Sequence, residues 1–266
     1  MEQNESAISL QPQLHRIPNR PRVHITLQGK GGVGKSLVAV LLAQYLRSTR
    51  VALQCVDTDP MNDTMAQFKA LNATHLDIVR EGRFDDGAYD ELMGQILAKR
   101  CSFVVDCGAA SFVALTSYFA ESDSLELLRA EGRDILFHTV ITGGQAMRDT
   151  LIGLKILLET TRGSGIVVWL NEYFGPIEAE VATNGQIVKK CFTQMKIFEE
   201  NRDAILGVVT IARRNPDTFG RDIRSMLSQK LTFEEIRQSA DWALISRSRL
   251  FRVEQDLYAQ LEPILG

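Results

Sequence analysis

The sequence has few cysteines, no long apolar run and no strong excess of charge, and each absence excludes a class of protein. Only four of its 266 residues are cysteines, without C-x-x-C spacing, which is typical of buried reduced thiols rather than of a disulfide framework or a zinc site. No run of eighteen apolar residues occurs, so no membrane-spanning helix is predicted. The net charge of −3 disfavours a protein whose main task is to coat nucleic acid.

The first 21 residues also lack the apolar core of a secretory signal, and they are polar, acidic at the start and punctuated by proline. We expect a disordered tail at residues 1–21 and a cytoplasmic protein. The remaining residues, 22–266, are expected to form one domain, because the chain is 45% hydrophobic and long enough for a large core.

The clearest functional signal is the segment HITLQGKGGVGKS at residues 24–36, which contains the phosphate-loop pattern G-x-x-x-x-G-K-[ST]. Glycines let the backbone come close to a phosphate, Lys35 supplies a charge for the β- and γ-phosphates, and Ser36 can ligate Mg²⁺. An apolar strand-like run precedes the loop, and an apolar helical run follows it. The N–H groups at the start of this helix can therefore meet the phosphates. The pattern predicts a site for ATP and Mg²⁺ formed by Gly29, Lys30, Gly31, Gly32, Val33, Gly34, Lys35, Ser36 and Leu37.

Acids at strand ends are a second signal. Asp106 directly follows the buried run at residues 102–105, which is the Walker B arrangement, in which a strand holds a carboxylate where it orders Mg²⁺ or its waters. Residues 108–111 then form a candidate switch II segment. Asp57 and Asp59 follow the strand-like run at 51–56, and carboxyl ends of strands are where α/β sheets place ligand chemistry.

Hydrophobic periodicity predicts strands alternating with helices, hence a mostly parallel α/β sheet covered by helices on both faces, the three-layer P-loop NTPase architecture. The predicted strands are 23–27, 51–56, 102–105, 134–141, 165–170 and 206–211, with a short extended piece at 76–79. The predicted helices are 37–46, 62–71, 87–99, 109–120, 146–158, 186–200, 217–227 and 233–236, followed by a C-terminal helix.

The C-terminal helix carries an apolar stripe, but its polar side bears acids that anionic lipid would repel. We therefore expect it to pack against the domain or a partner rather than to insert stably into a membrane. The stripe consists of Leu250, Val253, Leu257, Leu261 and Ile264, and the acids are Glu254, Asp256 and Glu262.

A lysine near the start of the phosphate loop, as well as at its end, resembles the deviant Walker A loop of the ParA/MinD family of ATPases, in the SIMIBI class. In that family the early lysine reaches the nucleotide of a partner subunit, so ATP closes a homodimer. The resemblance implies that Lys30 acts in trans and Lys35 in cis. It also implies that Asn171, at the end of a strand, contacts adenine, although asparagine is equally at home as a turn residue there.

Longer stretches, among them DTDPMNDT, DCGAASFVAL and VVWLNEYFGPIE, resemble the TraL family of plasmid conjugal transfer proteins. This implies a nucleotide switch that supports conjugative DNA transfer through protein partners. By motif, Asp59 would position the attacking water, and Asp57 would support a metal site formed by Ser36 and Asp106. The sequence departs from the proline-bearing segments common in ParA at DCGAAS and TGGQA, which leaves the rate of hydrolysis open.

Two other functions remain open. A partition-type ATPase would bind DNA non-specifically through arginines between residues 221 and 252, but interleaved acids favour a solvated face, so direct DNA binding is not favoured. A ligase of the dethiobiotin synthetase type shares the loop and would phosphorylate a carboxylate of a small substrate.

Overall fold

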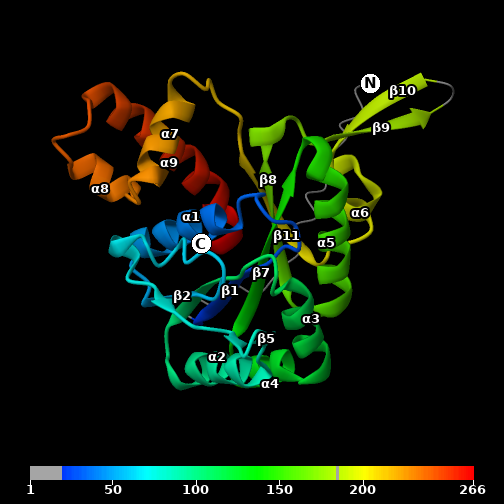
Figure 1. The fold of residues 1–266 in the computed structure, drawn as a ribbon. Helices are drawn as coiled ribbons and strands as arrows, with labels where there is room; N and C mark the ends of the chain where they lie inside the picture. Colours follow the sequence, from blue (N-terminus) through cyan, green and yellow to red (C-terminus); the bar gives the residue numbers. More distant parts are fainter. Residues whose placement is uncertain (1–19, 184–185) are drawn as a thin grey trace, which may run out of the picture.

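A parallel sheet of seven strands, in the order β11-β8-β7-β1-β6-β2-β3, forms the centre of the protein (Figure 1). The computed structural model describes residues 20–183 and 186–266, so the predicted tail lies largely outside the described residues. The strands of the sheet are β1 (Arg22–Thr26), β2 (Leu53–Asp57), β3 (Thr74–His75), β6 (Ser102–Asp106), β7 (Asp134–Thr142), β8 (Gly165–Asn171) and β11 (Ile205–Ile211).

Helices cover both faces of this sheet, as the alternating pattern predicted. On one face lie α2 (Asp86–Ala98), α3 (Phe112–Glu121), α4 (Ser124–Ala130) and α5 (Met147–Thr160). On the other lie α1 (Lys35–Ser48), α7 (Phe219–Ser228), α8 (Phe233–Gln238) and α9 (Leu244–Leu265). The three-layer P-loop NTPase prediction is therefore confirmed.

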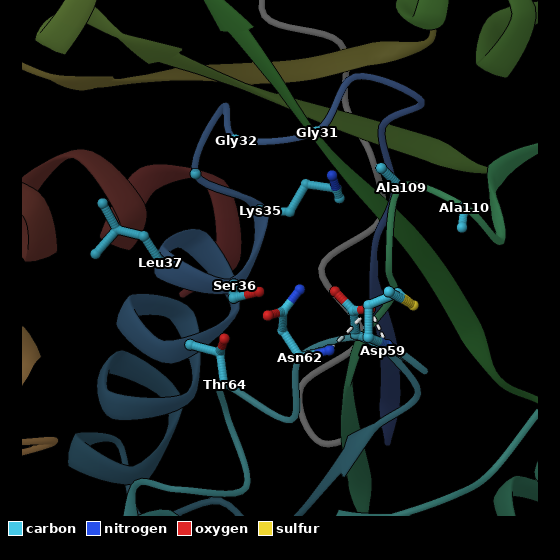
Figure 2. Close-up of a pocket in the computed structure, with 12 residues that line it drawn as sticks. Gly31, Gly32, Lys35, Ser36, Leu37, Asp59, Asn62, Thr64, Ala109 and Ala110 are labelled. Atoms are coloured by element: carbon cyan, nitrogen blue, oxygen red, sulfur yellow. Dashed lines mark hydrogen bonds between the residues drawn. The ribbon is translucent and has the colours of Figure 1, made fainter.

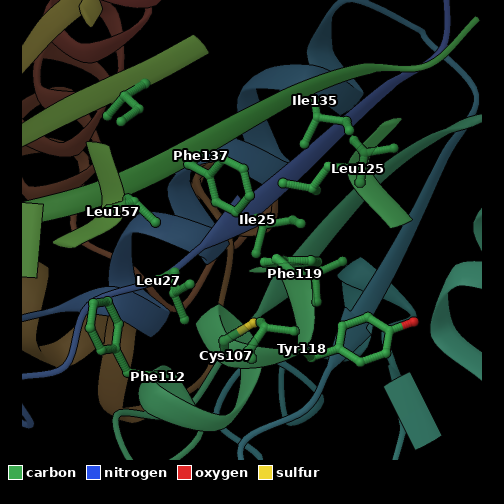
Figure 3. Close-up of a cluster of buried hydrophobic side chains, with 14 of the residues drawn as sticks. Ile25, Leu27, Cys107, Phe112, Tyr118, Phe119, Leu125, Ile135, Phe137 and Leu157 are labelled. Carbon is green, nitrogen blue, oxygen red and sulfur yellow. The ribbon is translucent and has the colours of Figure 1, made fainter. Parts of the chain in front are cut away.

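Two apolar cores separate the layers. In the core under α3 and α5, Ile25 and Phe137 of neighbouring strands face Phe119 and Leu157 of the helices (Figure 3). In the other core, α9 packs on β11 through its apolar stripe, from Leu250 at 1% exposure to Leu261 at 0%. Packing against the domain is thus what the stripe does. Among the described residues no helix combines the length and hydropathy needed to cross a bilayer.

The predicted helix at residues 62–71 is wrong. This segment is a series of turns that ends in the short 3₁₀ helix η1 (Lys69–Leu71). The reason is local competition for backbone N–H groups: the Asp57 carboxylate accepts hydrogen bonds from the N–H groups of Met65 and Ala66, and Asp59 accepts from Met61. Side-chain oxygens thus take the donors that a helix would have paired with its own carbonyls.

The predicted helix at residues 186–200 is also wrong. Its first half is β10 (Gln186–Cys191), which pairs antiparallel with β9 (Glu178–Thr183) in a hairpin that projects from the sheet (Figure 1). Only α6 (Lys196–Glu199) is helical in the second half, after the 3₁₀ turn η4 (Phe192–Gln194). A second small hairpin joins β4 (Val79–Arg80) to β5 (Arg83–Phe84).

The four thiols are all free, and two of them, Cys55 and Cys107, are buried, as predicted. Cys101 is half-buried, and Cys191 is exposed because it ends the projecting hairpin. Burial raises the pKa of the Cys107 thiol to about 12, so this residue packs as a small apolar side chain.

Two histidines that are distant in the sequence meet inside the sheet. The Trp169 indole N–H donates to Nδ1 of His138 (3.0 Å), so His138 carries its proton on Nε2 and donates to Nδ1 of His24 (2.9 Å). Both imidazoles are fully buried, and burial is the main cause that lowers the pKa of each, to about 3 for His138. Both rings are therefore neutral in the folded protein.

We predict that this pair makes the protein less stable in mild acid. In the unfolded chain both histidines take up protons below their ordinary pKa of about 6.5, whereas in the fold they do not, so stability present above pH 6.5 is lost as the pH falls. Two such groups should lower the free energy of unfolding by about 2 kcal/mol between pH 6.5 and 5.5. Urea unfolding at both pH values measures this difference.

The matched control is a variant with both histidines changed to leucine. The quantity compared with the wild type is the change in the free energy of unfolding between the two pH values, not the free energy itself. Asp106, whose pKa is raised, works in the opposite direction but is present in both proteins. Equal changes in the two proteins would contradict a neutral histidine pair.

Candidate functional site

The carboxyl ends of the central strands bring the predicted polar residues to one edge of the sheet. The register pairs Thr26 of β1 with Asp106 of β6, and Asp106 with Asp57 of β2, so three residues far apart in the sequence lie in one row. Next to this row a pocket of about 480 Å³ opens (Figure 2). Its lining consists of Gly31, Gly32, Gly34, Lys35, Ser36, Leu37, Asp59, Met61, Asn62, Thr64, Ala109 and Ala110.

The phosphate loop wraps around the N-terminus of α1, as its glycines predict. Gly32 has φ +73° and Gly34 has φ +102°, the left-handed region that glycine adopts without strain. Gly34 caps α1, and no side chain caps this helix end or brings an acid into its first turn. The free N–H groups and the positive end of the helix dipole are therefore available to an anion.

Lys35 lies inside the pocket, at 7% exposure, and its Nζ donates to the backbone carbonyl of Lys30 at 3.0 Å. Burial lowers its pKa, while the carboxylates of Asp106 and Asp59 act in the opposite sense. Lys35 is thus a desolvated cation held beside acids, in the position that its motif predicted.

Ser36 and Asp106 form the part of the site that suits a hard cation. Asp106 is fully buried, its Oδ1 accepts from the Thr26 hydroxyl (3.1 Å), and the nearby Ser36 hydroxyl lowers its pKa. Its Oδ2 has no hydrogen-bond partner among the described residues. Burial raises the pKa of Asp106 to about 7, and the nearby charge of Asp57 adds to this effect.

These residues fit Mg²⁺ bound with phosphate. A buried carboxylate with one oxygen free, next to a serine hydroxyl, is a donor set for a cation that keeps several waters. In the described part of the chain no group of three His, Cys, Asp or Glu side chains could hold a metal by itself. The site therefore suits a cation that arrives with a phosphate rather than a protein-only metal cage.

Asp57 was predicted to support the metal site, but both of its carboxylate oxygens accept hydrogen bonds from backbone N–H groups. Its Oδ1 accepts from the N–H of Asp59 (3.1 Å), and its Oδ2 accepts from Met65 (2.8 Å) and Ala66 (3.1 Å). The side chain is fully buried, and burial raises its pKa while these backbone bonds lower it. In this structure Asp57 shapes the loop that carries Asp59.

Asp59 lines the pocket opposite Ser36 and Lys35 (Figure 2). Its Oδ1 accepts from the N–H groups of Met61 (2.9 Å) and Asn62 (3.3 Å), which fixes the carboxylate at the start of the loop. Asn62 and Thr64 also line the pocket, although the sequence does not single them out. They fall in the segment that was predicted to be a helix, where polar residues are expected on the solvent side.

Lys30 lies at the rim rather than in the pocket. Its Nζ forms an ion pair with Asp149 near the start of α5 (2.8 Å), and both side chains are about half exposed. The hydrogen bond from Lys30 lowers the pKa of Asp149. Water screens such a pair, so Lys30 is held only weakly within its own chain.

Asn171 is brought to the phosphate loop by the end of β8. Its Nδ2 donates to the carbonyl of Val33 (2.9 Å), and its Oδ1 accepts from the N–H of Tyr173 (3.2 Å). The side chain is 5% exposed. In this structure its amide braces the loop and turns the chain out of the sheet; contact with adenine stays a prediction.

Gln28 supports the site but is not singled out by the sequence, since it stands just before the phosphate-loop pattern, which begins at Gly29. Its buried amide donates to the Thr139 hydroxyl and to the carbonyls of Val140 and Thr150. These bonds tie the start of the phosphate loop to β7 and α5. Nothing in the local sequence signals this role, because all three acceptors lie more than a hundred residues away.

Comparison with known proteins agrees with this geometry. The model of the family described as "CobQ/CobB/MinD/ParA nucleotide binding domain" matches residues 25–260. Two proteins of Escherichia coli, both named Protein TraL, are each 37% identical over 242 residues, which is 91% of this chain and 97% of theirs. The MinD cell division protein of Aquifex aeolicus is 14% identical, with a TM-score of 0.48 over 90% of this chain and 97% of that one.

The family model spans both the phosphate loop and the strands that carry Asp106 and Asn171, and the TraL relatives extend over nearly the whole chain. The chain therefore belongs to the TraL family, within the CobQ/CobB/MinD/ParA group of nucleotide-binding proteins.

Proposed function

We propose that the protein is a nucleotide switch that binds ATP with Mg²⁺, dimerises around the bound nucleotide and hydrolyses it slowly. The observation that carries this proposal is the start of α1, where Ser36 lies near Asp106 and, among the described residues, the buried Oδ2 of that carboxylate has no hydrogen-bond partner. A phosphate with its cation would supply what this helix end and this carboxylate lack.

Each residue has a distinct part in the proposed reaction. The N–H groups of the phosphate loop and Lys35 bind and orient the phosphates, and Ser36 and Asp106 hold Mg²⁺, which supplies charge neutralisation. Asp59 orients a water for in-line attack on the γ-phosphorus, where positioning and electrostatics do most of the catalysis. Asp57 keeps the Asp59 loop in shape.

The proposed dimerisation depends on Lys30, whose ion pair with Asp149 is exposed and whose loop lies beside the pocket. In the dimer we propose that Lys30 leaves Asp149 for the phosphates of the partner's nucleotide, as the ParA/MinD resemblance implies. Membership of the TraL family supports a role in plasmid conjugative transfer. We propose in addition that the protein acts in the cytoplasm and through protein partners of the transfer apparatus.

The test combines mass and turnover. With Mg²⁺ and ATP, light scattering should give a dimer, and with ADP or no nucleotide a monomer. Asp59→Ala should retain the ATP-dependent dimer but lose roughly 100-fold or more in turnover, since it removes only the group that orients the water. Normal turnover in this variant would remove Asp59 from the mechanism, and a mass indifferent to nucleotide would remove the switch.

Phosphate release without an added metabolite distinguishes this function from that of a ligase, which needs a carboxylate acceptor. One of the arginines considered for DNA binding, Arg249, turns inward to Asp222 (2.6 Å), which also lies 3.7 Å from Arg221. A gel shift that depends on ATP and weakens steeply with salt would favour the partition-type function instead.

A further inference from the structure

Gly108, two residues after Asp106, lies directly against the Asp59 carboxylate. A Cβ atom added at Gly108 would be 2.6 Å from Oδ1 and 2.8 Å from Cγ of Asp59. Gly108 is not among the glycines with positive φ, so its backbone conformation suits any residue. What this position requires of glycine is therefore space for Asp59.

Asp59 cannot easily move away from such an atom. Its side chain has a single methylene, and its Oδ1 is held by the N–H groups of Met61 and Asn62. The start of this loop is in turn tied to the buried Asp57. The carboxylate thus lies between its own loop and the α-carbon of Gly108. An atom added at Gly108 would push the carboxylate toward its own loop.

The segment that contains Gly108 also contacts the phosphate loop. The Ser111 hydroxyl donates to the Gly108 carbonyl (2.8 Å), which closes residues 108–111 into a turn. The next residue, Phe112, lays its ring against Gly29, where an added Cβ would be 3.1 Å from Cδ1. One short segment therefore touches the phosphate loop at one end and Asp59 at the other.

We infer that Gly108 is a positioning residue, whose bare α-carbon sets where the Asp59 carboxylate stands in the pocket. This inference rests on the proposed function and adds to it the contact that places the water-orienting group. The turn formed by residues 108–111 thereby links the phosphate loop to Asp59.

Gly108→Ala tests the inference. To restore an ordinary contact, the Asp59 carboxylate must move from 2.6 Å to about 3.4 Å from the new methyl group. A misplacement of about 1 Å can cost roughly 100-fold in rate, so we expect kcat to fall at least tenfold. ATP affinity should change less than about threefold, because the phosphate ligands are untouched.

A second measurement needs no turnover. In nucleotide-free protein, Gly108→Ala should lower Tm by a few degrees, but by less than about one degree in the Asp59→Ala background, where the obstructing carboxylate is gone. Gly94→Ala is the control, because its Cβ would meet no described atom within 4 Å and its φ is ordinary. It should leave kcat unchanged, and its effect on Tm should be the same in the wild type and in the Asp59→Ala background.

The outcomes separate the two claims. A wild-type protein without ATP hydrolysis would overturn the proposed function. The effect of Gly108→Ala on Tm, compared with and without the Asp59 carboxylate, would still decide whether Gly108 and Asp59 are in contact. An active wild type with normal kcat in Gly108→Ala, or additive effects on Tm, would overturn the positioning role and leave the proposed function standing.

Discussion

Lys35→Met abolishes ATP binding at micromolar concentrations in the outcome we expect. A charge-assisted hydrogen bond contributes about 1.5–3 kcal/mol, which corresponds to roughly 10- to 100-fold in affinity, and Lys35 is itself largely buried. Its loss also leaves Asp106 and Asp59 without their nearest cation, and these carboxylates then repel the triphosphate. Titration with a fluorescent ATP analogue measures the change.

Methionine keeps most of the volume of Lys35, so the fold should persist, as circular dichroism can verify. The matched control is Lys155→Met on α5, an exposed lysine beside Glu159, which should bind ATP like the wild type. If Lys35→Met bound ATP with unchanged affinity, the pocket would not be the nucleotide site.

Lys30→Ala should be monomeric with ATP under conditions that make the wild type a dimer. In the proposed dimer the side chain neutralises the partner's phosphates, so its removal leaves two polyanions facing one another across the interface. ATP binding by the monomer should change much less, because Lys30 lies at the rim and pairs with Asp149 rather than lining the pocket. Light scattering and the binding titration separate the two effects.

Asp149→Ala is the informative companion, because it removes the partner that holds Lys30 within its own chain. It should retain the ATP-dependent dimer, whereas a loss of charge at the rim in general would disturb both variants alike. An ATP-dependent dimer that survives Lys30→Ala would assign the contact across the interface to another residue.

The fold and the phosphate site could be predicted from the sequence because their signals are local. The phosphate-loop pattern, with its glycines at positive φ, describes a single turn, and the buried strand before Asp106 needs only four apolar or small residues. The alternation of strands and helices predicted the three layers, because a strand covered on both faces must be apolar throughout.

Two helices were mispredicted, the first because side chains compete for backbone donors and the second because a local hairpin signal was outweighed. At residues 62–71, helical composition lost to carboxylates on a neighbouring strand end, which take the backbone donors. At residues 186–200, the Asn184–Gly185 dipeptide is the strongest short hairpin signal, but the charged residues around it resemble a helix surface. The dipeptide itself lies outside the described residues.

By itself the sequence determined the identity of the fold and the residues proposed to bind phosphate, because loop chemistry and hydrophobic period are properties of neighbouring residues. Only the tertiary structure decided how those residues are held: that Asp57 shapes a loop, that Asn171 braces Val33, and that the bare α-carbon of Gly108 stands against Asp59. The last two are contacts between segments dozens to more than a hundred residues apart. Strand register brings such segments together, and no local pattern encodes it.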